Sequence, residues 1–320
     1  MVVAGTRPEM IKMAPVVRQL TSRRDLPITV VSTAQQADLL PDFVGLLGVK
    51  VDHQLDVMSA GQSLNSLLAR TIAALDRVIG RVAPDLVVVQ GDTTSALAGA
   101  LAGRMRSVSV AHIEAGLRTY DPANPFPEES NRRLISHIAA LHCAPTRRNR
   151  DALLREGIAP MDIVVTGNPV VASLHDALAQ SRACPRIAEL LAPLEGLKLV
   201  VLTTHRRESL GATLTRNLRT LRTFVEDNSD TVLVAPVHLN PEVKQAIEQE
   251  LADAERIALI EPLDYPSFLR LLQAAWLIVS DSGGVQEEVA SLGRPLLVLR
   301  STTERPEAVE AGIARLAGEW

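Results

Sequence analysis

The chain has 320 residues, of which 47% are apolar and 22% are charged, a balance that is typical of a folded globular protein and excludes wholesale disorder. Its 33 Lys and Arg residues against 37 Asp and Glu residues give a formal net charge of −4, which argues against a nucleic-acid-binding protein, because such a protein needs a basic face. The length predicts two domains, since single hydrophobic cores stop growing near about 250–300 residues.

Short β-branched segments alternate with longer segments of helical spacing along the chain. A first short strand ends at Gly5. Further strands are predicted, in chain order, at 28–32, 85–90, 107–111, 140–144, 162–166, 198–202, 231–234, 257–260, 276–279 and 296–299. The clearest helical segments are 62–82, 212–226 and 241–252. Apolar strands that alternate with helices are typical of parallel sheets built from βαβ units.

The alternation pauses once, between about residues 168 and 197, and then restarts. We therefore predict an α/β fold with two Rossmann-like domains, an N-terminal domain at 1–170 and a C-terminal domain at 197–320, joined by a linker region at 171–196. Ligands of such sheets bind outside the carboxyl ends of the strands, and two domains of this kind predict a pocket between them.

Three acidic residues follow strands or loops of the predicted N-terminal domain. Asp92 comes directly after the strand at 85–90, Glu114 follows the strand at 107–111, and Glu128 opens a helix after a proline-rich loop. A carboxylate just beyond a buried strand costs free energy unless it is paired or used, although Asp92 would also be an ordinary helix N-cap. Because the ends of parallel strands share one edge, the sequence favours general acid and base chemistry by these three carboxylates.

Two basic residues lie at the beginning of the first predicted helix. Gly5 ends the first strand, and Thr6 and Glu9 have the spacing of a capping box. Free N–H groups at a helix N-terminus attract anions, and Arg7 and Lys12 would add full positive charges there. The same pattern is typical of an ordinary capped helix with solvated basic residues, so the segment alone leaves both interpretations open.

Two segments of the predicted C-terminal domain also follow strands. His205 comes after the strand at 198–202 and is flanked by two arginines, which favours an anion site. The small residues at 282–284 follow the strand at 276–279, and they let backbone N–H groups approach a phosphate closely. Arg305 lies after the last predicted strand, where it would add a positive charge.

Several common kinds of site are absent from the sequence. The seven His and two Cys residues are scattered, with none at the spacing of a zinc site, so no metal is expected. The sequence has no P-loop, no dinucleotide fingerprint and no serine nucleophile elbow. The N-terminus has no signal pattern and no apolar run approaches the about 18 residues that span a membrane, so we expect a cytoplasmic chain with no membrane partner.

Taken together, these segments resemble the non-hydrolysing UDP-N-acetylglucosamine 2-epimerases. Several matching segments are long and nearly unbroken, which makes the resemblance more specific than any single motif. They run almost from one end of the chain to the other, at 5–15, 91–94, 112–118, 127–132, 166–168, 205–209, 236–241, 281–288 and 302–308.

The resemblance implies the glycosyltransferase-B architecture, with two Rossmann-like domains, each a parallel sheet flanked by helices, and a UDP-sugar in the cleft. It also implies that a base removes the proton on C2 of the sugar while UDP leaves C1 by anti elimination, which forms a bound 2-acetamidoglucal. Re-addition of UDP, with a proton on the opposite face of C2, converts UDP-N-acetylglucosamine into UDP-N-acetylmannosamine. Neither a redox cofactor nor a metal is expected.

The resemblance also assigns roles to residues. It makes Asp92, Glu114 and Glu128 the acid and base groups, in an order that the sequence leaves open, and His205 the group that assists the departure and return of UDP. The substrate-binding residues that it implies are Arg7, Lys12, Phe268, Ser282, Gly283, Gly284, Glu288 and Arg305. Bacterial relatives also bind a second, activating UDP-sugar, and the corresponding effector residues here are Gln35, Arg70, Arg206 and His238.

The chain departs from the family pattern in two places. After Gln35 it lacks the usual His-Arg pair and has Asp38, whose carboxylate would repel a nucleotide sugar, so we expect weakened effector binding. It also ends at Trp320, before the terminal helices of the family, and we therefore expect a less stable C-terminal domain and weaker closure.

Three other functions fit parts of the pattern. A hydrolysing 2-epimerase would release UDP and free N-acetylmannosamine, a glycosyltransferase would share the fold but need an acceptor, and an inactive relative would bind the UDP-sugar without reaction. The intact segments 6–9 and 127–129 favour the non-hydrolysing reaction, and the presence of all three carboxylates and His205 argues against lost chemistry. We expect a UDP-sugar as the partner, no nucleic acid, and, by resemblance alone, a homodimer.

Overall fold

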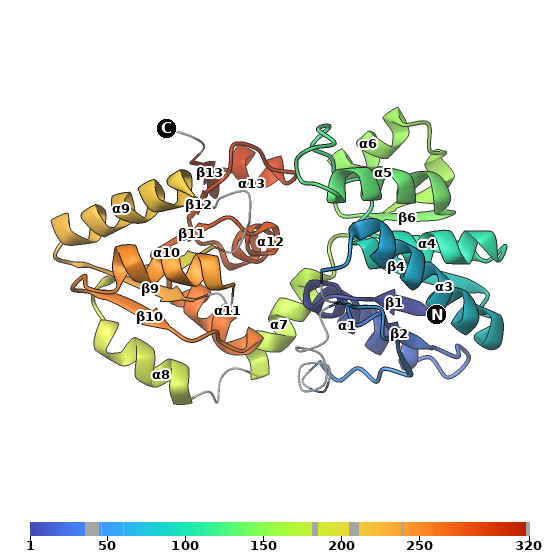
Figure 1. Cartoon of the computed structure of the whole chain (residues 1–320), viewed down its shortest axis with the longest axis horizontal. Helices are drawn as coiled ribbons and strands as arrows, with labels where there is room; N and C mark the ends of the chain where they lie inside the picture. The colour runs from blue at the N-terminus through green and yellow to red at the C-terminus, as the bar shows by residue number, and fades with distance from the viewer. Residues whose placement is uncertain are drawn as a thin grey trace. The chain divides into compact units, whose positions relative to one another are not determined.

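The computed structural model describes residues 1–35, 45, 47–59, 61–180, 185–204, 211–237 and 240–317. The chain divides into two compact units, Met1–Ser173, called unit 1, and Leu174–Trp320, called unit 2. Each unit contains one parallel β-sheet with helices packed on it (Figure 1).

The sheet in the described part of unit 1 has seven strands, and every adjacent pair is parallel. Their order is β3-β2-β1-β4-β5-β6-β7, so the direction of the order reverses between β1 and β4. Such a switch point leaves a crevice outside the carboxyl ends of the strands, where ligands bind. The strands are β1 Val2–Ala4, β2 Val30–Ser32, β3 His53–Gln54, β4 Leu86–Gln90, β5 Ser109–Ile113, β6 Leu141–Ala144 and β7 Ile163–Val165.

Polar side chains cap the beginnings of α1, α3, α4 and α6 in unit 1. At α1 the Thr6 side chain and the Glu9 side chain each accept a hydrogen bond from the other residue's backbone N–H, and Pro8 lies in the first turn. At α3 the Ser63 side chain accepts from the N–H of Ser66. The helices are α1 Arg7–Thr21, α3 Leu64–Val82, α4 Thr94–Met105, α5 Glu128–Ile138 and α6 Arg147–Arg155, with a short 3₁₀ turn at Pro160–Asp162. The helix α7 Val170–Gln180 begins in unit 1 and continues into unit 2.

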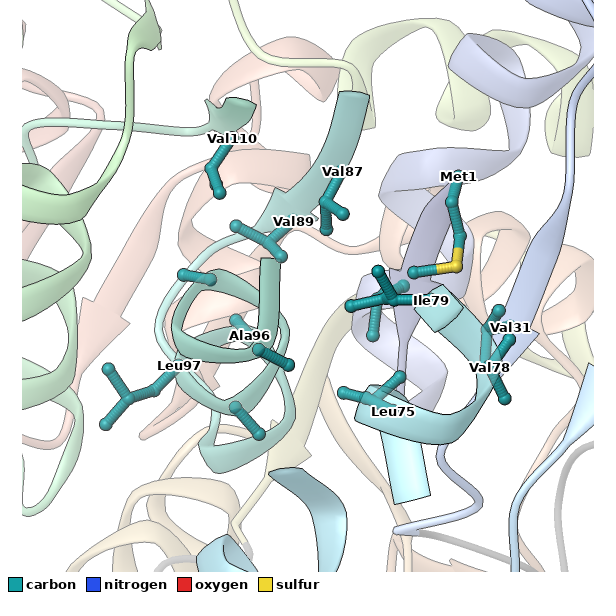
Figure 2. Close-up of a cluster of buried hydrophobic side chains, with 14 of the residues drawn as sticks. Met1, Val31, Leu75, Val78, Ile79, Val87, Val89, Ala96, Leu97 and Val110 are labelled. Carbon is teal, nitrogen blue, oxygen red and sulfur yellow. The ribbon is translucent and has the colours of Figure 1, made fainter. Parts of the chain in front are cut away.

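An apolar cluster holds the sheet of unit 1 against α3 and α4 (Figure 2). Val87 and Val89 of β4 join Leu75 and Ile79 of α3 and Ala96 of α4 in this cluster, and each is at most 2% exposed. Burial of one Val, Leu or Ile side chain contributes about 1.5–3 kcal/mol, so this packing fixes the ends of the strands that carry the candidate site.

The sheet in the described part of unit 2 has six strands in the order β10-β9-β8-β11-β12-β13, again all parallel, with its switch point between β8 and β11. The strands are β8 Lys198–Thr203, β9 Thr231–Pro236, β10 Ile257–Ile260, β11 Leu277–Ser280, β12 Leu296–Val298 and β13 Ala314–Leu316. The helices are α8 Pro185–Leu191, α9 Ala212–Asp227, α10 Pro241–Leu251, α11 Tyr265–Ala274, α12 Gly283–Leu292 and α13 Pro306–Glu310, with a 3₁₀ turn at Ala192–Leu194.

Each strand predicted between residues 28 and 299 overlaps an observed strand. The strand predicted at 107–111 begins later, at Ser109, because Ser107 takes a left-handed φ of 58° and the N–H of Val108 donates to the carbonyl of Gly103, which closes α4 first. The sequence did not indicate β3 or β13, since strands of two and three residues are too short to show a pattern.

Among the described residues, none of the helices combines the length and the apolar character that a membrane span requires. The segment 171–196, which the sequence analysis treats as a linker region, contains most of α7 and all of α8.

Candidate active site

The carboxyl ends of β1, β4 and β5 lie side by side at the switch point of unit 1, because β4 pairs with both other strands. Gly5 follows β1, Gly91 and Asp92 follow β4, and Glu114 follows β5. The register pairs Gln90 with Ile113, so that the two strands end at the same level. The topology thus brings Asp92 and Glu114 to one edge of the sheet.

Glu114 is a buried carboxylate in a strained backbone conformation. It is 4% exposed and has a φ of 65°, in the left-handed region that a residue other than Gly, Asn or Asp rarely adopts. One carboxylate oxygen accepts hydrogen bonds from Lys12 Nζ at 2.6 Å and from Asn168 Nδ2 at 3.1 Å. The other accepts from Gln90 Nε2. Such strain persists only where the surroundings enforce it, and three donors on one carboxylate do so here.

Lys12 is the basic partner in this group. It lies on α1 and is 7% exposed, so its ammonium ion is removed from water together with the Glu114 carboxylate. A buried charge is tolerated when an opposite charge and hydrogen bonds replace its hydration. The structure therefore brings together two predicted site residues, Lys12 and Glu114.

Glu9 anchors the turn between β1 and α1. Its Oε2 accepts from the backbone N–H groups of Gly5 and Thr6 at 3.0 and 2.8 Å, and its Oε1 accepts from Thr93 Oγ1 at 2.8 Å. Burial raises the pKa of the Glu9 carboxyl, while these hydrogen bonds lower it. Because Thr93 lies at the beginning of α4, Glu9 ties the turn after β1 to the turn after β4.

Gly5 is the point of closest approach between three segments. A Cβ at this position would lie 2.1 Å from Ser95 Oγ and 2.2 Å from Thr33 Oγ1, so no other residue fits without a shift. The two hydroxyls lie 2.6 Å apart, and Ser95 Oγ is also 2.8 Å from Gln35 Oε1. The ends of β1 and β2 and the beginning of α4 are thereby packed against one another.

Asp92 does not cap α4. The N-cap is Thr93, whose side chain accepts from the N–H of Ala96 at 3.0 Å, so the interpretation of Asp92 as an ordinary cap is wrong. The Asp92 carboxylate instead accepts from Arg132 Nη2 at 2.5 Å, and its backbone carbonyl accepts from Asn131 Nδ2 at 2.9 Å. Both donors lie on α5, which therefore holds Asp92 in place.

The turn at Gly91 is also held from β5. His112 is fully buried, and its Nε2 lies 2.7 Å from the Gly91 carbonyl oxygen, which can only accept. Burial lowers the pKa of His112 to about 3, although this hydrogen bond acts in the opposite direction. The imidazole is therefore neutral near pH 7 and donates through Nε2.

The two adjacent glutamates at the start of α5 differ in environment. Glu128 is half-buried, whereas Glu129 is fully buried and accepts from the backbone N–H groups of Thr119 and Tyr120 at 3.0 and 3.1 Å. Glu129 thus fixes the loop that follows β5, and Glu128 is the more accessible carboxylate. Arg7, another predicted site residue, is half-buried in the first turn of α1.

In unit 2 the predicted phosphate-binding residues lie at the start of α12, directly after β11. Ser282 is the N-cap, and its Oγ accepts from the N–H of Val285 at 3.5 Å. Gly283 and Gly284 form the first turn, where N–H groups point out of the helix. Glu288, in the second turn, is 7% exposed.

Arg305 lies against this helix start. A Cβ at Gly283 would be 2.9 Å from Arg305 Nη1, so the guanidinium group lies directly against the glycine. Its Nε donates to Glu287 Oε1 at 2.5 Å, and its Nη1 donates to Glu304. Phe268, the last of the predicted substrate-binding residues in this unit, is half-buried on α11.

The proposed effector residues are only partly described. Gln35 lies three residues after β2, beside Ser95, and Arg70 is exposed on α3, where it donates to Ser59 and Gln62. No hydrogen bond or ion pair joins Gln35 to Arg70 in the described part of the chain. His205, Arg206, His238 and Asp38 lie outside the described residues.

Four polar side chains that donate to Asp92 or Glu114 have no role in the sequence analysis, namely Gln90, Asn131, Arg132 and Asn168. Asn131, Arg132 and Asn168 lie inside segments that match the family, and Gln90 directly precedes one. Their location in or beside these segments was the one feature of the sequence that could have identified them. Their partners are distant in sequence, so their function becomes visible only when the sheet order is known.

The fold of the chain occurs in solved structures of very different sequence. The glycosyltransferase SnogD from Streptomyces nogalater is 16% identical to this chain and has a TM-score of 0.61, covering 99% of this chain and 85% of that one. Two Rossmann-like domains with parallel sheets define the glycosyltransferase-B architecture, and the fold class expected from the sequence is confirmed.

Similarity in sequence is much higher to one enzyme family. A crystal structure of UDP-GlcNAc 2-epimerase from Neisseria meningitidis bound to UDP-GlcNAc is 40% identical and has a TM-score of 0.94, covering 99% of this chain and 86% of that chain. A probable UDP-N-acetylglucosamine 2-epimerase of Ralstonia nicotianae is 45% identical, with 99% of this chain and 86% of the relative covered. The sequence pattern of the family described as UDP-N-acetylglucosamine 2-epimerase matches residues 18–320. The chain belongs to this family of isomerases, and the resemblance to UDP-N-acetylglucosamine 2-epimerases noted in the sequence is confirmed.

Proposed function

We propose that the chain interconverts UDP-N-acetylglucosamine and UDP-N-acetylmannosamine by inverting C2 of the sugar, without net hydrolysis. The observation that carries this proposal is the carboxylate pair at the edge of unit 1, with Glu114 strained and paired to Lys12 and Asp92 paired to Arg132. Stored backbone strain and buried, paired charges at strand ends are typical of catalytic sites. The family relationship supplies the substrate class.

The proposed reaction is an elimination followed by an addition. A carboxylate takes the proton from C2, the electrons of that C–H bond form a C1–C2 double bond, and the C1–O bond breaks so that UDP leaves with its electron pair. In the return step an oxygen of UDP attacks C1, and a proton is delivered to the opposite face of C2. Substrate and product are isomers, so atoms and charge balance and no oxidant or reductant is consumed.

The acid and base groups in this proposal are Asp92, Glu114 and Glu128. The C2 proton is weakly acidic, so the base that removes it must be held close and in line. The fixed positions of Asp92 and Glu114 and the partial exposure of Glu128 are consistent with such roles. Arg7 and Lys12 are proposed to contact the substrate from α1, where positive charge favours an anionic ligand.

The UDP end of the substrate is proposed to bind unit 2. The N–H groups at the start of α12, together with Ser282, Gly283 and Gly284, would hold phosphate oxygens. Glu288 would accept hydrogen bonds from the ribose hydroxyls. Phe268 and Arg305 would contact the nucleotide, and His205 would assist UDP as it leaves and returns, which remains a sequence prediction.

Several finer expectations remain predictions. The effector site at Gln35, Arg70, Arg206 and His238, the homodimer and a cytoplasmic location all rest on the resemblance or on composition.

Incubation with UDP-N-acetylglucosamine tests the proposal. Proton and phosphorus NMR should show UDP-N-acetylmannosamine accumulating to an equilibrium mixture, with no build-up of free UDP. Stoichiometric release of UDP with free N-acetylmannosamine would identify a hydrolysing enzyme instead. Binding of the UDP-sugar without conversion would identify a binding protein, and either result overturns the proposal.

A further inference from the structure

Arg132 is a buried charged residue that contacts Asp92 directly. Its side chain is 3% exposed, its Nη2 donates to Asp92 Oδ2 at 2.5 Å, and its Nη1 lies 3.3 Å from Glu129 Oε2. A guanidinium ion in the protein interior needs carboxylate partners, and its planar fork can hold two at fixed angles. Arg132 therefore links the carboxylate of Asp92, in the turn after β4, to that of Glu129, in the first turn of its own helix α5.

The two partners of Arg132 have different environments. Glu129 is fully buried and its oxygens also accept from the backbone N–H groups of Thr119 and Tyr120, so it is committed to the loop after β5. Asp92 has a side chain that is 23% exposed, so its carboxylate can reach a ligand. The contact between Arg132 and Asp92 therefore orients a carboxylate that is otherwise able to move.

Further hydrogen bonds hold the same residue through its backbone. Asn131 Nδ2 donates to the carbonyl of Asp92 at 2.9 Å, and His112 Nε2 donates to the preceding carbonyl, that of Gly91, at 2.7 Å. Asp92 is thus fixed through its side chain, its own carbonyl and the carbonyl before it. With the backbone held in this way, Arg132 determines the orientation of the carboxylate group alone.

Glu128 lies four residues before Arg132 on α5, so the two side chains are on the same face of the helix. The helix that carries Glu128 is therefore the helix that fixes Asp92. An inversion at C2 needs proton-transfer groups with a fixed separation, because one face loses the proton and the other gains it.

We infer that Arg132 is a positioning residue for the epimerisation. It occupies Oδ2 of Asp92, leaves Oδ1 as the oxygen that exchanges the C2 proton, and sets the distance between Asp92 and Glu128. This inference rests on the proposed function.

Substitutions at Arg132 and at its neighbour Arg133 test the inference. Arg132→Met removes the guanidinium group and keeps the apolar stem, whereas Arg132→Lys keeps the charge without the fork. Arg133→Met is the matched control, because Arg133 follows on the same helix, is 46% exposed and lies 3.6 Å from Glu156. We expect the kcat of Arg132→Met to fall about 100-fold, as a misplaced catalytic group causes. Arg132→Lys should recover part of the loss, and Arg133→Met should behave as the wild type.

The separation of kcat from KM identifies how Arg132 acts. A positioning residue leaves substrate binding intact, so KM and the UDP dissociation constant should change by less than about twofold. In an Asp92→Asn background, Arg132→Met should slow the residual C2 exchange by less than about twofold, since the carboxylate it positions is gone. Should Arg132→Met fail to fold, the same comparison with Asp92→Asn is made with Arg132→Lys.

Three outcomes overturn the inference: full activity of Arg132→Met, a raised KM at unchanged kcat, or losses that multiply in the double variant. A wild-type chain that does not convert UDP-N-acetylglucosamine overturns the proposed function, and the inference with it. The two failures are distinguishable, because the second appears before any substitution is made.

Discussion

Glu114 combines two unfavourable features at one position. Its left-handed φ of 65° costs of order 1 kcal/mol, and its carboxylate is buried at 4% exposure. Lys12, Gln90 and Asn168 offset these costs by donating to the carboxylate. Gln90 and Asn168 are neutral donors, whereas Lys12 also neutralises the charge of the Glu114 carboxylate.

Glu114→Gln should therefore lower the free energy of unfolding, by about 3 kcal/mol, because it removes the carboxylate that lies 2.6 Å from the buried Lys12 ammonium ion. Addition of Lys12→Met to this variant should restore part of the stability. Urea unfolding of the two single variants and the double variant measures the coupling. If the losses in the free energy of unfolding simply add in the double variant, Lys12 and Glu114 do not stabilise each other.

His112 gives unit 1 a sensitivity to acid. The folded state keeps the imidazole neutral down to about pH 3, whereas the unfolded chain takes up the proton at the ordinary pKa of 6.5. Between these values the unfolded state binds more protons, so the stability from this site is present above pH 6.5 and is lost as the pH falls.

Between pH 7 and pH 5 this loss is about 2 kcal/mol for one such histidine. His112→Gln keeps a side-chain N–H for the Gly91 carbonyl but does not titrate, so its free energy of unfolding should fall by about 2 kcal/mol less than that of the wild type over this range. Identical pH dependence in His112→Gln and the wild type would show that His112 titrates normally.

At the scale of elements, the turns after the strands hold the site together. The turn after β1 contacts the end of β2 and the start of α4 through Gly5, and it contacts Thr93 through Glu9. A substitution in this turn should therefore also disturb the packing of the end of β2 and the start of α4.

Gly5→Ala should destabilise the chain by about 3 kcal/mol, since the new Cβ would lie 2.1 Å from Ser95 Oγ and 2.2 Å from Thr33 Oγ1. Gly45→Ala is the control, because a Cβ there meets no atom within 4 Å. Thermal unfolding of both variants makes the comparison. A melting temperature for Gly5→Ala equal to that of Gly45→Ala would refute the close approach at this turn.

The sequence predicted the elements better than the contacts between them. Runs of apolar residues such as the one in β4 indicated strands, because a strand that is buried on both faces is apolar at nearly every position. The pairings that define the site, such as Arg132 with Asp92, join residues 40 positions apart, and local patterns carry no information about them. The sequence likewise suggested Asp92 as a possible N-cap of α4, whereas the structure has Thr93 in that place. Both residue types are good N-caps, so only geometry distinguishes them.

At the scale of the whole molecule, the two sheets share one topology and carry different chemistry. Both reverse their strand order at the first strand of the unit, β1 in unit 1 and β8 in unit 2. Unit 1 places carboxylates after its central strands, and unit 2 places small residues and a helix N-terminus there. We therefore expect proton transfer and nucleotide binding to be separable by mutation.

Glu288→Ala should weaken UDP binding about tenfold or more, because hydrogen bonds from ribose hydroxyls to a charged acceptor contribute about 1.5–3 kcal/mol. Asp92→Asn should bind UDP with an affinity within about twofold of the wild type. Isothermal titration calorimetry with UDP measures both. Equal weakening in the two variants would contradict the separation of roles.

The measurement that tests the central claim most directly is hydrogen exchange at C2 of the sugar in deuterium oxide. The wild type should introduce deuterium at C2 of both UDP-N-acetylglucosamine and UDP-N-acetylmannosamine. Asp92→Asn and Glu128→Gln should each slow this incorporation by about 100-fold or more, while Asp151→Asn, an exposed control on α6, should not. Epimerisation without deuterium at C2, or incorporation at the wild-type rate in both carboxylate variants, would contradict the claim that these groups move the C2 proton.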